Sequence, residues 1–418
     1  MQHINYSRQV IERYCDDLGR IMPVASSVSN FAALCGTAQQ RYAVAAQAIA
    51  RAYGRCGIVI LHDDPTFDSF LYNLSQLLPS GQHFNFINQR TYDPLYGMDA
   101  ESIQNLLIPA QHDGITAPEV ERIRAGLRVY LEIMRLQFSK NATTFGQFPY
   151  NLNLLLQLTQ MPLETLVQEV LCALPQSLAR SMKDVIHAPG MQQSIYAAVL
   201  NFSTLMERYL WTPGQFQHHT QLSIIQSVFN QQVISVRVPA SRSELLAFLN
   251  AELEVLAQQN TPFLLIADGI NLSNCPALQD RFLNDHLQQR YSTGILASEF
   301  HSVSDRAEDA SRLLSQCHDV FLFNCHSANQ ALPIVSQLGK YYRTEIERNT
   351  HYERQPFHLF RSKGHGRNEK YIEELNVRPE DMMGTPDRAL LCGINHTSPV
   401  IIRHLRTNGG ISHALLLS

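Results

Sequence analysis

NFAALCG (residues 30–36), TAQQRYAVAAQAIARAYGR (37–55) and GIVILHDD (57–64) follow one another near the start of the chain. The first run has the length of a strand and ends on a glycine. The second is rich in alanine and favours a helix, and the third is a continuous apolar run of the buried-strand type. A strand, a helix and a second strand in this order form the basic unit of a parallel α/β sheet. The sequence therefore predicts an α/β fold.

Outside this unit, the pattern of apolar residues divides the chain into three parts. Between residues 98 and 228 apolar side chains recur every three or four positions, which predicts helices, with breaks at Pro149, Pro162, Pro175 and Pro213. Strand-like runs resume at QVISVRVP (232–239), PFLLIADG (262–269), TGILASEF (293–300) and DVFLFNC (319–325). We therefore expect residues 1–97 and 229–418 to form one α/β domain, and residues 98–228 to be an all-α insertion.

The two ends of the chain carry weaker patterns. Residues 1–20 read as a short amphipathic helix, and RALLCGI (388–394) with PVIIRHLR (399–406) reads as a final hairpin. The N-terminus lacks the basic head and apolar core of a secretory signal. No run approaches the ~18 apolar residues of a membrane-spanning helix.

Composition narrows the class of protein further. The 418 residues are 45% apolar and only 17% charged, against roughly 25% in an average protein, and the formal net charge is −4. Such a balance gives no overall attraction to nucleic acid or to acidic membranes. The eight cysteines include no C-x-x-C pair and lie mostly in apolar stretches, as buried free thiols do. These features predict a cytoplasmic protein.

The turn after the first strand is where a phosphate-binding loop would stand. Such a loop needs glycines that let its N–H groups surround a phosphate, a lysine for the β- and γ-phosphates, and a serine or threonine for Mg²⁺. Gly36 and Thr37 open the turn, but Gln40, Arg41 and Tyr42 fill the glycine, lysine and hydroxyl positions. Spacing alone favours an ordinary turn from strand to helix.

A second acidic position follows the strand at 262–268. Asp268 ends that strand, from which a carboxylate can hold Mg²⁺ or its water, but Gly269 stands where a hydrolase has a second acid. Taken alone, Asp268 and Gly269 read as a turn after a buried strand.

In their order along the chain, these pieces resemble the TraG/TraD-type coupling ATPases of type IV secretion and conjugation, within the HerA/FtsK group of RecA-like motors. The resemblance covers most of residues 25–407. TGILASEFHSVSD (293–305) looks like the family strand that carries a Gln-Ser sensor, with His301 at the glutamine position. The resemblance to this family implies a RecA-like P-loop NTPase fold with an inserted all-α domain. The implied nucleotide site comprises Gly36, Thr37, Gln40, Arg41, Tyr42, Asp268 and His301.

Every motif that would touch ATP is altered, and this sets our hypothesis for function. We expect a catalytically degenerate coupling-ATPase-like protein without catalytic residues, an assembly or adaptor subunit of a DNA- or protein-transfer apparatus. No cofactor is expected, although binding of ATP with Mg²⁺ is left open. The resemblance is compatible with protein partners, among them an active coupling ATPase, with binding of DNA and with formation of an oligomer. It is also compatible with attachment to the inner membrane through partners. The alternatives are a nucleotide-binding but non-hydrolysing regulatory subunit and a single-stranded DNA-binding module.

Three further groups of residues have both a functional and a simpler structural interpretation. Cys325 and His326 are a poor thiol and base pair, because neighbours in a strand point to opposite faces. His62, Asp63 and Asp64 end a buried strand, where they would hold a cation or have a structural role. The stretch 340–370 interleaves basic and aromatic residues, as a single-strand groove requires, but its four glutamates favour a solvated or protein-docking face. Its candidate nucleic-acid-binding residues are Arg354, Arg361, Lys363 and Arg367, and SKGHGRN (362–368) reads as a glycine-rich loop.

Overall fold

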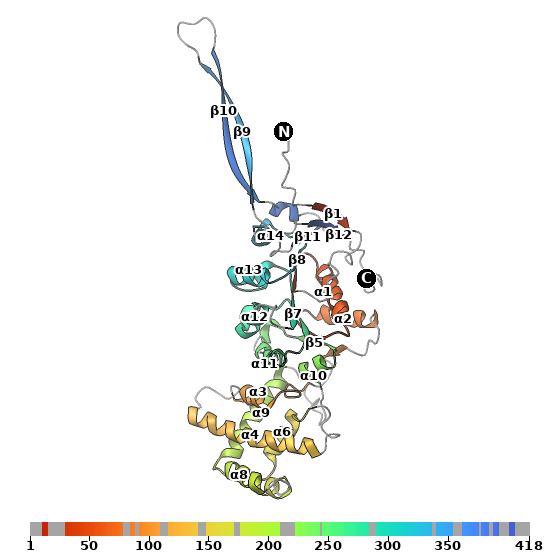
Figure 1. Cartoon of the computed structure of the whole chain (residues 1–418), viewed down its shortest axis with the longest axis vertical. Coiled ribbons are helices and arrows are strands. Elements are labelled where there is room, and N and C mark those ends of the chain that lie inside the picture. Colours follow the sequence, from red (N-terminus) through yellow and green to blue (C-terminus); the bar gives the residue numbers. More distant parts are fainter. Residues whose placement is uncertain are drawn as a thin grey trace.

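A computed structural model defines the architecture of the chain (Figure 1). It describes residues 11–15, 30–77, 84–87, 92–108, 116–140, 148–170, 176–209, 222–242, 245–283, 290–336, 340–353, 362–375, 378–383, 388–392 and 401–405.

A sheet of ten strands runs through the body of the molecule. Seven neighbouring strands are parallel, in the spatial order β8 (Asp319–Leu322), β2 (Phe31–Leu34), β7 (Tyr291–Ala297), β6 (Phe263–Asp268), β3 (Gly57–His62), β5 (Val233–Arg237) and β4 (Phe84–Phe86). With β4 and β5 set aside, β2, β3, β6, β7 and β8 follow in this order along the chain, so their spatial order is 5-1-4-3-2. This is the RecA-like α/β arrangement, and it confirms the fold class predicted from the sequence.

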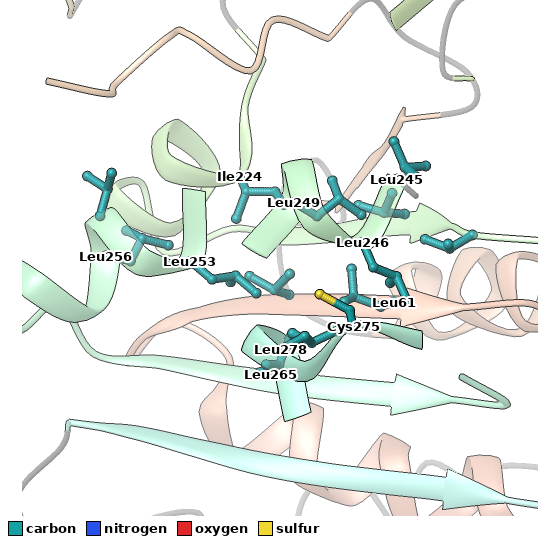
Figure 2. Close-up of a cluster of buried hydrophobic side chains, with 14 of the residues drawn as sticks. Leu61, Ile224, Leu245, Leu246, Leu249, Leu253, Leu256, Leu265, Cys275 and Leu278 are labelled. Atoms are coloured by element: carbon teal, nitrogen blue, oxygen red, sulfur yellow. The ribbon is translucent and has the colours of Figure 1, made fainter. Parts of the chain in front are cut away.

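Alternate residues of the parallel strands contribute to two separate cores. Phe31 and Ala33 of β2 join the core beneath α1 (Ala38–Ala52) and α2 (Pro65–Leu77). Ala32 and Leu34 join the main core beneath α11 (Leu245–Gln258), α12 (Pro276–Leu283) and α13 (Ala307–Ser315). Figure 2 shows part of this main core, where leucines of α11 pack towards Leu61 of β3. Helices cover both faces of the sheet, which explains why its strands are continuous apolar runs in the sequence.

A block of helices follows β4, as the three- and four-residue periodicity predicts. All described elements between residues 100 and 229 are helical: α3 (Ala100–Leu107), α4 (Ala117–Lys140), α6 (Leu152–Gln160), α7 (Leu163–Thr165), a π-helical turn η4 (Leu166–Val170), α8 (Gln176–Ile186), α9 (Met191–Tyr209) and α10 (Ile224–Phe229). The main core continues from the sheet into this block. Pro149 precedes α6 and Pro162 caps α7, whereas Pro175 and Pro213 lie outside the described residues. The division of the chain at 97/98 and 228/229 stays a prediction.

Two buried acids connect the helical block to the rest of the body. Glu252 of α11 accepts hydrogen bonds from the backbone N–H groups of Ile224 and Ile225 at the start of α10 (2.9 and 3.2 Å). Asp93 accepts one from the N–H of Leu152 at the start of α6 (2.7 Å). Because each carboxylate satisfies N–H groups at a helix start, it fixes where that helix leaves the body.

Three strands extend the sheet beyond β8. β11 (Arg388–Cys392) is antiparallel to both β8 and β12 (Ile401–Leu405), so the predicted C-terminal hairpin is confirmed. β1 (Ile11–Cys15) lies parallel to β12 at the edge of the sheet. The prediction of a helix over residues 1–20 is therefore wrong for this segment, because pairing with a strand at the far end of the sequence overrides its local pattern.

A long two-stranded ribbon projects from one end of the body (Figure 1). β9 (Lys340–Glu353) and β10 (Ser362–Leu375) pair antiparallel over all fourteen residues of each strand. The glycine-rich loop predicted at 362–368 is wrong, because this segment lies within β10. Its glycines are tolerated because the cross-strand ladder, rather than local propensity, holds the extended backbone.

The remaining described elements are short. They are α14 (Ala328–Val335) and the 3₁₀ turns η6 (Ala240–Arg242), η7 (Leu272–Asn274), η8 (Phe300–Ser302) and η10 (Pro379–Met382). Within the described part of the chain, no helix combines the length and the hydropathy that crossing a membrane requires.

Candidate functional site

The turn between β2 and α1 stands where a phosphate loop would stand, but its chemistry differs. Cys35 and Gly36 both have left-handed backbone angles (φ of 60° and 62°). The Gly36 N–H donates to the carbonyl of Asn324 (3.0 Å), which ties the turn to the segment after β8. A Cβ on Gly36 would stand 2.5 Å from the Cβ of Phe323, so only glycine fits here. The turn is therefore held rigidly by its neighbours.

Gln40 folds back over the turn that it follows. Its Oε1 accepts a hydrogen bond from the Thr37 N–H (2.9 Å), while the Thr37 side chain accepts one from the Gln40 N–H (3.3 Å), forming a capping box at the start of α1. Gln40 Oε1 also lies 2.4 Å from where a Cβ on Gly36 would stand. The Gln40 side chain thus occupies space beside the loop, and it accepts from one of the loop's N–H donors.

Arg41 is directed at the loop backbone. Its side chain is buried, and Nη1 donates to the carbonyl oxygens of Cys35 and Gly36, both at 3.1 Å. Two polar atoms nearby, Arg41 Nε and Asn324 Oδ1, are buried without a hydrogen-bond partner among the described residues. The cation at the lysine position is therefore engaged mainly by its own loop.

Tyr42 contacts the acid that follows β3. Its hydroxyl donates to Oδ2 of Asp64 (3.1 Å) and lies 3.3 Å from the Thr66 hydroxyl, and its ring packs against Phe67 and Phe70. Burial raises the pKa of Tyr42 above its ordinary value. The hydroxyl at the Mg²⁺-ligand position is thus neutral and engaged with the protein.

Asp268 lies at the end of β6, close to these groups. Its side chain is buried, and burial raises its pKa to about 6, against the opposing effect of the charges of Arg41 and His62. The Tyr42 side chain lies close enough to lower the pKa of this carboxyl. The structure thus brings Arg41, Tyr42 and Asp268 together. Gly269 follows with a left-handed backbone (φ of 65°), as expected for a turn after a strand.

His301 differs from the loop residues in that its side chain is exposed. It belongs to η8 after β7, its side chain is exposed, and its ring contacts that of Phe300 edge to face. Because it is exposed, His301 is free of the buried network around Asp268.

His62, Asp68 and Ser235 form a polar cluster in which His62 and Ser235 are buried and Asp68 is half-buried. Of the three, the sequence indicated only the histidine. His62 Nε2 lies 3.0 Å from both Asp68 Oδ1 and Ser235 Oγ, and the Ser235 hydroxyl donates to the same Asp68 oxygen (2.9 Å). A nucleophilic triad needs its serine and its acid on different nitrogens of the histidine ring. Here both use Nε2, and Ser235 is buried, so the cluster anchors α2 to the sheet. Nothing in the spacing of these residues signals the contact.

The described residues offer no metal centre. They contain no group of three or more His, Cys, Asp or Glu side chains arranged to hold a metal ion. Asp64, one of the acids weighed as a cation ligand, instead accepts from Tyr42 and from the Thr66 N–H (2.8 Å). These bonds give it a structural role.

Two buried thiols meet beside the loop. The Cys35 and Cys325 thiols lie close enough to affect each other, and this interaction lowers the pKa of Cys35 and raises that of Cys325. Cys325 Sγ donates to the carbonyl of Phe323 (3.4 Å). The thiol of Cys325 is thus engaged by a backbone carbonyl and lies beside a second thiol, which agrees with the argument against a thiol and base pair with His326.

The nucleic-acid candidates fall on the ribbon or outside the described residues. Lys363 and Arg367 lie in β10, opposite Tyr352 and Arg348 of β9. Arg354 and Arg361 lie outside the described residues. The structure thus places the two described candidates on one strand of the ribbon.

Comparison with known proteins yields similarity of structure alone. No family model matches the chain, and no curated protein matches it. The bacterial conjugative coupling protein TrwB, in an unbound form, shares 12% identity over 93% of this chain and 91% of its own, with a TM-score of 0.46. TrwB in complex with sulphate shares 11% over 94% and 93%, with a TM-score of 0.48. VirB4 of Thermoanaerobacter pseudethanolicus shares 10% over 73% and 81%, with a TM-score of 0.35.

Proposed function

We propose that this chain is a RecA-like motor fold that no longer turns over ATP and that acts as an assembly or adaptor subunit. The observation that carries the proposal is the engagement of the loop by its own side chains. Gln40 takes the N–H of Thr37, and the Arg41 guanidinium binds the carbonyls of Cys35 and Gly36. The first contact takes an N–H donor that a phosphate would use, and the second holds the cation on carbonyl oxygens, away from a phosphate.

The chemistry of hydrolysis is missing at the same place. A P-loop enzyme needs a cation on the β- and γ-phosphates and a hydroxyl on Mg²⁺. Arg41 is turned to carbonyls, and the Tyr42 hydroxyl is held by Asp64. Asp268 has no acidic neighbour at position 269 to polarise a water. These losses concern separate catalytic roles, so one restored residue would not recover turnover.

The proposed setting is a conjugation or type IV secretion apparatus. Support comes from the order of loop, helical insertion and later strands, which follows that of the coupling ATPases. The helical block α3–α10 would recruit partners, among them an active coupling ATPase, and would hold the protein on the cytoplasmic side of the inner membrane. A pull-down of the chain from a cell that makes such an apparatus, compared with a chain altered on this block, tests the setting separately from the nucleotide chemistry.

A second candidate, supported by the two unpartnered atoms near the loop, is a subunit that binds nucleotide without hydrolysing it. Arg41 Nε and Asn324 Oδ1 are the groups that such a ligand would engage. ATP would then be a structural ligand that stabilises the loop.

Calorimetry of the purified chain with ATP and with ADP, with and without Mg²⁺, separates the two candidates. We expect no binding heat at millimolar nucleotide, and no difference between the wild type, Arg41→Ala and Asp268→Ala. Micromolar binding that either variant abolishes would establish the nucleotide-binding subunit instead. Sustained ATP turnover that Asp268→Asn removes would contradict both.

A further inference from the structure

Two buried cysteines stand at the carboxyl ends of neighbouring strands. Cys35 directly follows β2, and Cys325 comes shortly after the end of β8. These two strands are parallel and stay in register up to their last residues. Their hydrogen bonding continues beyond the strands, because the N–H of Gly36, next to Cys35, donates to the carbonyl of Asn324, next to Cys325 (3.0 Å). The backbones that carry the two cysteines are therefore fixed side by side.

The two thiols also lie on the same face of the sheet. Cys35 and Cys325 both belong to the main core, whereas Phe323 joins the core beneath α1 and α2. The Cys325 side chain turns back along its own strand, since its Sγ donates to the carbonyl of Phe323 (3.4 Å). Phe323 is itself bonded to β2, because its N–H donates to the carbonyl of Leu34 (2.9 Å). The Cys325 sulfur is thus directed back to the level of Cys35.

Cys35 occupies a backbone position that normally favours glycine. Its φ of 60° lies in the left-handed region, which is uncommon for a residue with a side chain. The surroundings hold it there, since its N–H donates to the carbonyl of Ala297 (2.9 Å) and its carbonyl accepts from Arg41 Nη1 (3.1 Å). Strained positions of this kind persist where neighbours fix them, and they cluster at functional sites. A cysteine at such a position points to a role for its sulfur.

The surroundings make the two thiols unequal as nucleophiles. The interaction with Cys325 lowers the pKa of Cys35, and the charge of Arg41 acts in the same direction, whereas burial opposes both. Cys35 and burial both raise the pKa of Cys325. Burial likewise raises the pKa of two other buried thiols, Cys275 and Cys317. The thiolate is the reactive form of cysteine, so Cys35 is the thiol of this group that attacks first.

We propose that Cys35 and Cys325 form a reversible disulfide when hydrogen peroxide, an oxidant small enough to enter the core, reaches them. The Cys35 sulfur attacks one oxygen of the peroxide and the O–O bond breaks. The other oxygen leaves as hydroxide and takes up the Cys35 proton as water, which leaves a sulfenic acid on Cys35. The Cys325 sulfur then attacks the Cys35 sulfur, the S–O bond breaks, and a second water leaves with the Cys325 proton. The two thiols together lose two electrons and two protons, and the peroxide is reduced to two waters.

The disulfide joins the turn that opens α1 to the segment between β8 and α14. A bond between positions so far apart in the sequence restricts the unfolded chain strongly, so the oxidised protein is expected to unfold at a higher urea concentration. It also restrains the turn in the folded protein. The backbone amides of Gly36 and Thr37 are therefore expected to exchange hydrogen more slowly after oxidation.

Mass spectrometry of the full-length chain after treatment with hydrogen peroxide tests the proposal. The remaining thiols are blocked with N-ethylmaleimide in urea, and the chain is digested without a reductant. We expect a peptide pair joined through Cys35 and Cys325 that dithiothreitol separates. Cys325→Ser should stop at a sulfenic acid on Cys35, which dimedone traps, and Cys35→Ser should leave Cys325 as a thiol. The matched control Cys317→Ser removes a thiol as buried as Cys325, each 2% exposed, and should form the disulfide like the wild type.

Three outcomes would overturn the proposal. The first is that no joined peptide forms in the wild type while circular dichroism shows it folded, or that one forms only when peroxide is added in urea. The second is that Cys317 is oxidised as fast as Cys35. The third is that dimedone labels Cys325 in folded Cys35→Ser as strongly as it labels Cys35 in folded Cys325→Ser. None of these measurements involves a nucleotide or a partner, so they are independent of the proposed function.

Discussion

At the scale of single residues, Asp93 shows how burial changes the chemistry of a side chain. Its carboxylate accepts the N–H groups of Leu95 (2.9 Å) and Leu152 (2.7 Å), and it is shielded from solvent. Burial raises the pKa of Asp93 to about 7, although these backbone hydrogen bonds act in the opposite direction. The folded protein therefore holds this proton more tightly than the unfolded chain does.

This difference in proton affinity predicts how stability changes with pH. A carboxyl whose pKa is higher when folded contributes stability at low pH, and that contribution is lost as pH rises through the folded value. We expect the free energy of unfolding to fall by up to about 1.4 kcal/mol per pH unit between about pH 4 and 7 from this group. In Asp93→Asn that part of the slope should vanish, as urea titrations at several pH values would show. An equal slope in both proteins would contradict the assignment.

The candidate site illustrates what the sequence tells of single residues and what it omits. That Gln40, Arg41 and Tyr42 replace the residues of a phosphate loop can be read directly from the chain. The partners that these residues contact cannot be read from the chain. The acid that binds Tyr42 follows a different strand, and the Gly36 N–H donates to the carbonyl of Asn324. Contacts between residues distant in sequence depend on the completed sheet, and no local pattern encodes them.

At the scale of elements, the pairing of β2 with β7 depends on one close approach. Phe31 lies opposite Gly294 in the register, and a Cβ on Gly294 would stand 2.3 Å from Cζ of the Phe31 ring. Any side chain at position 294 must therefore displace that ring, which is fully buried. The glycine makes room for the largest side chain of β2.

A double-mutant cycle tests this packing. Gly294→Ala should lower the free energy of unfolding by about 1–3 kcal/mol through overpacking, as measured by chemical denaturation. Phe31→Leu removes the atoms that clash, so the double variant should lose less stability than the two single changes added together. Strict additivity would show that the ring and the glycine do not compete for the same space.

The elements also differ in how well the sequence predicts them. The central strands were predicted because burial on both faces demands continuous apolar runs, as in GIVILHDD and PFLLIADG. β9 and β10 have no such runs in the sequence, and the glycines of β10 resemble those of a loop. The segment of β1 reads as a helix because β12, its partner among the described strands, lies nearly the whole chain away.

At the scale of the whole molecule, the ribbon is attached to the body only near its base in Figure 1. Leu375 packs against the main core, and Lys340 is paired with Glu373 (3.1 Å) across the first residues of the ribbon. The outer part therefore adds little to the stability of a single copy.

Shortening the ribbon tests this independence. Residues 343–372 can be replaced by Asn-Gly, a two-residue turn suited to joining paired strands, because Tyr342 lies opposite Glu373. We expect the free energy of unfolding to change by less than about 0.5 kcal/mol, as measured by chemical denaturation. A large loss of stability would show that the outer ribbon supports the body.

The pairing of β1 with β12 limits how early the sheet can form during synthesis on the ribosome. β1 is synthesised before every other described strand, but β12, the strand that pairs with it, is synthesised after all of them. β2 likewise cannot pair until β7 and β8 have been synthesised. β9 and β10, in contrast, are neighbours in the chain and can pair as soon as both have emerged. The nascent sheet therefore stays unfinished until β12 has emerged, and until then its exposed strand edges are prone to wrong pairing and aggregation.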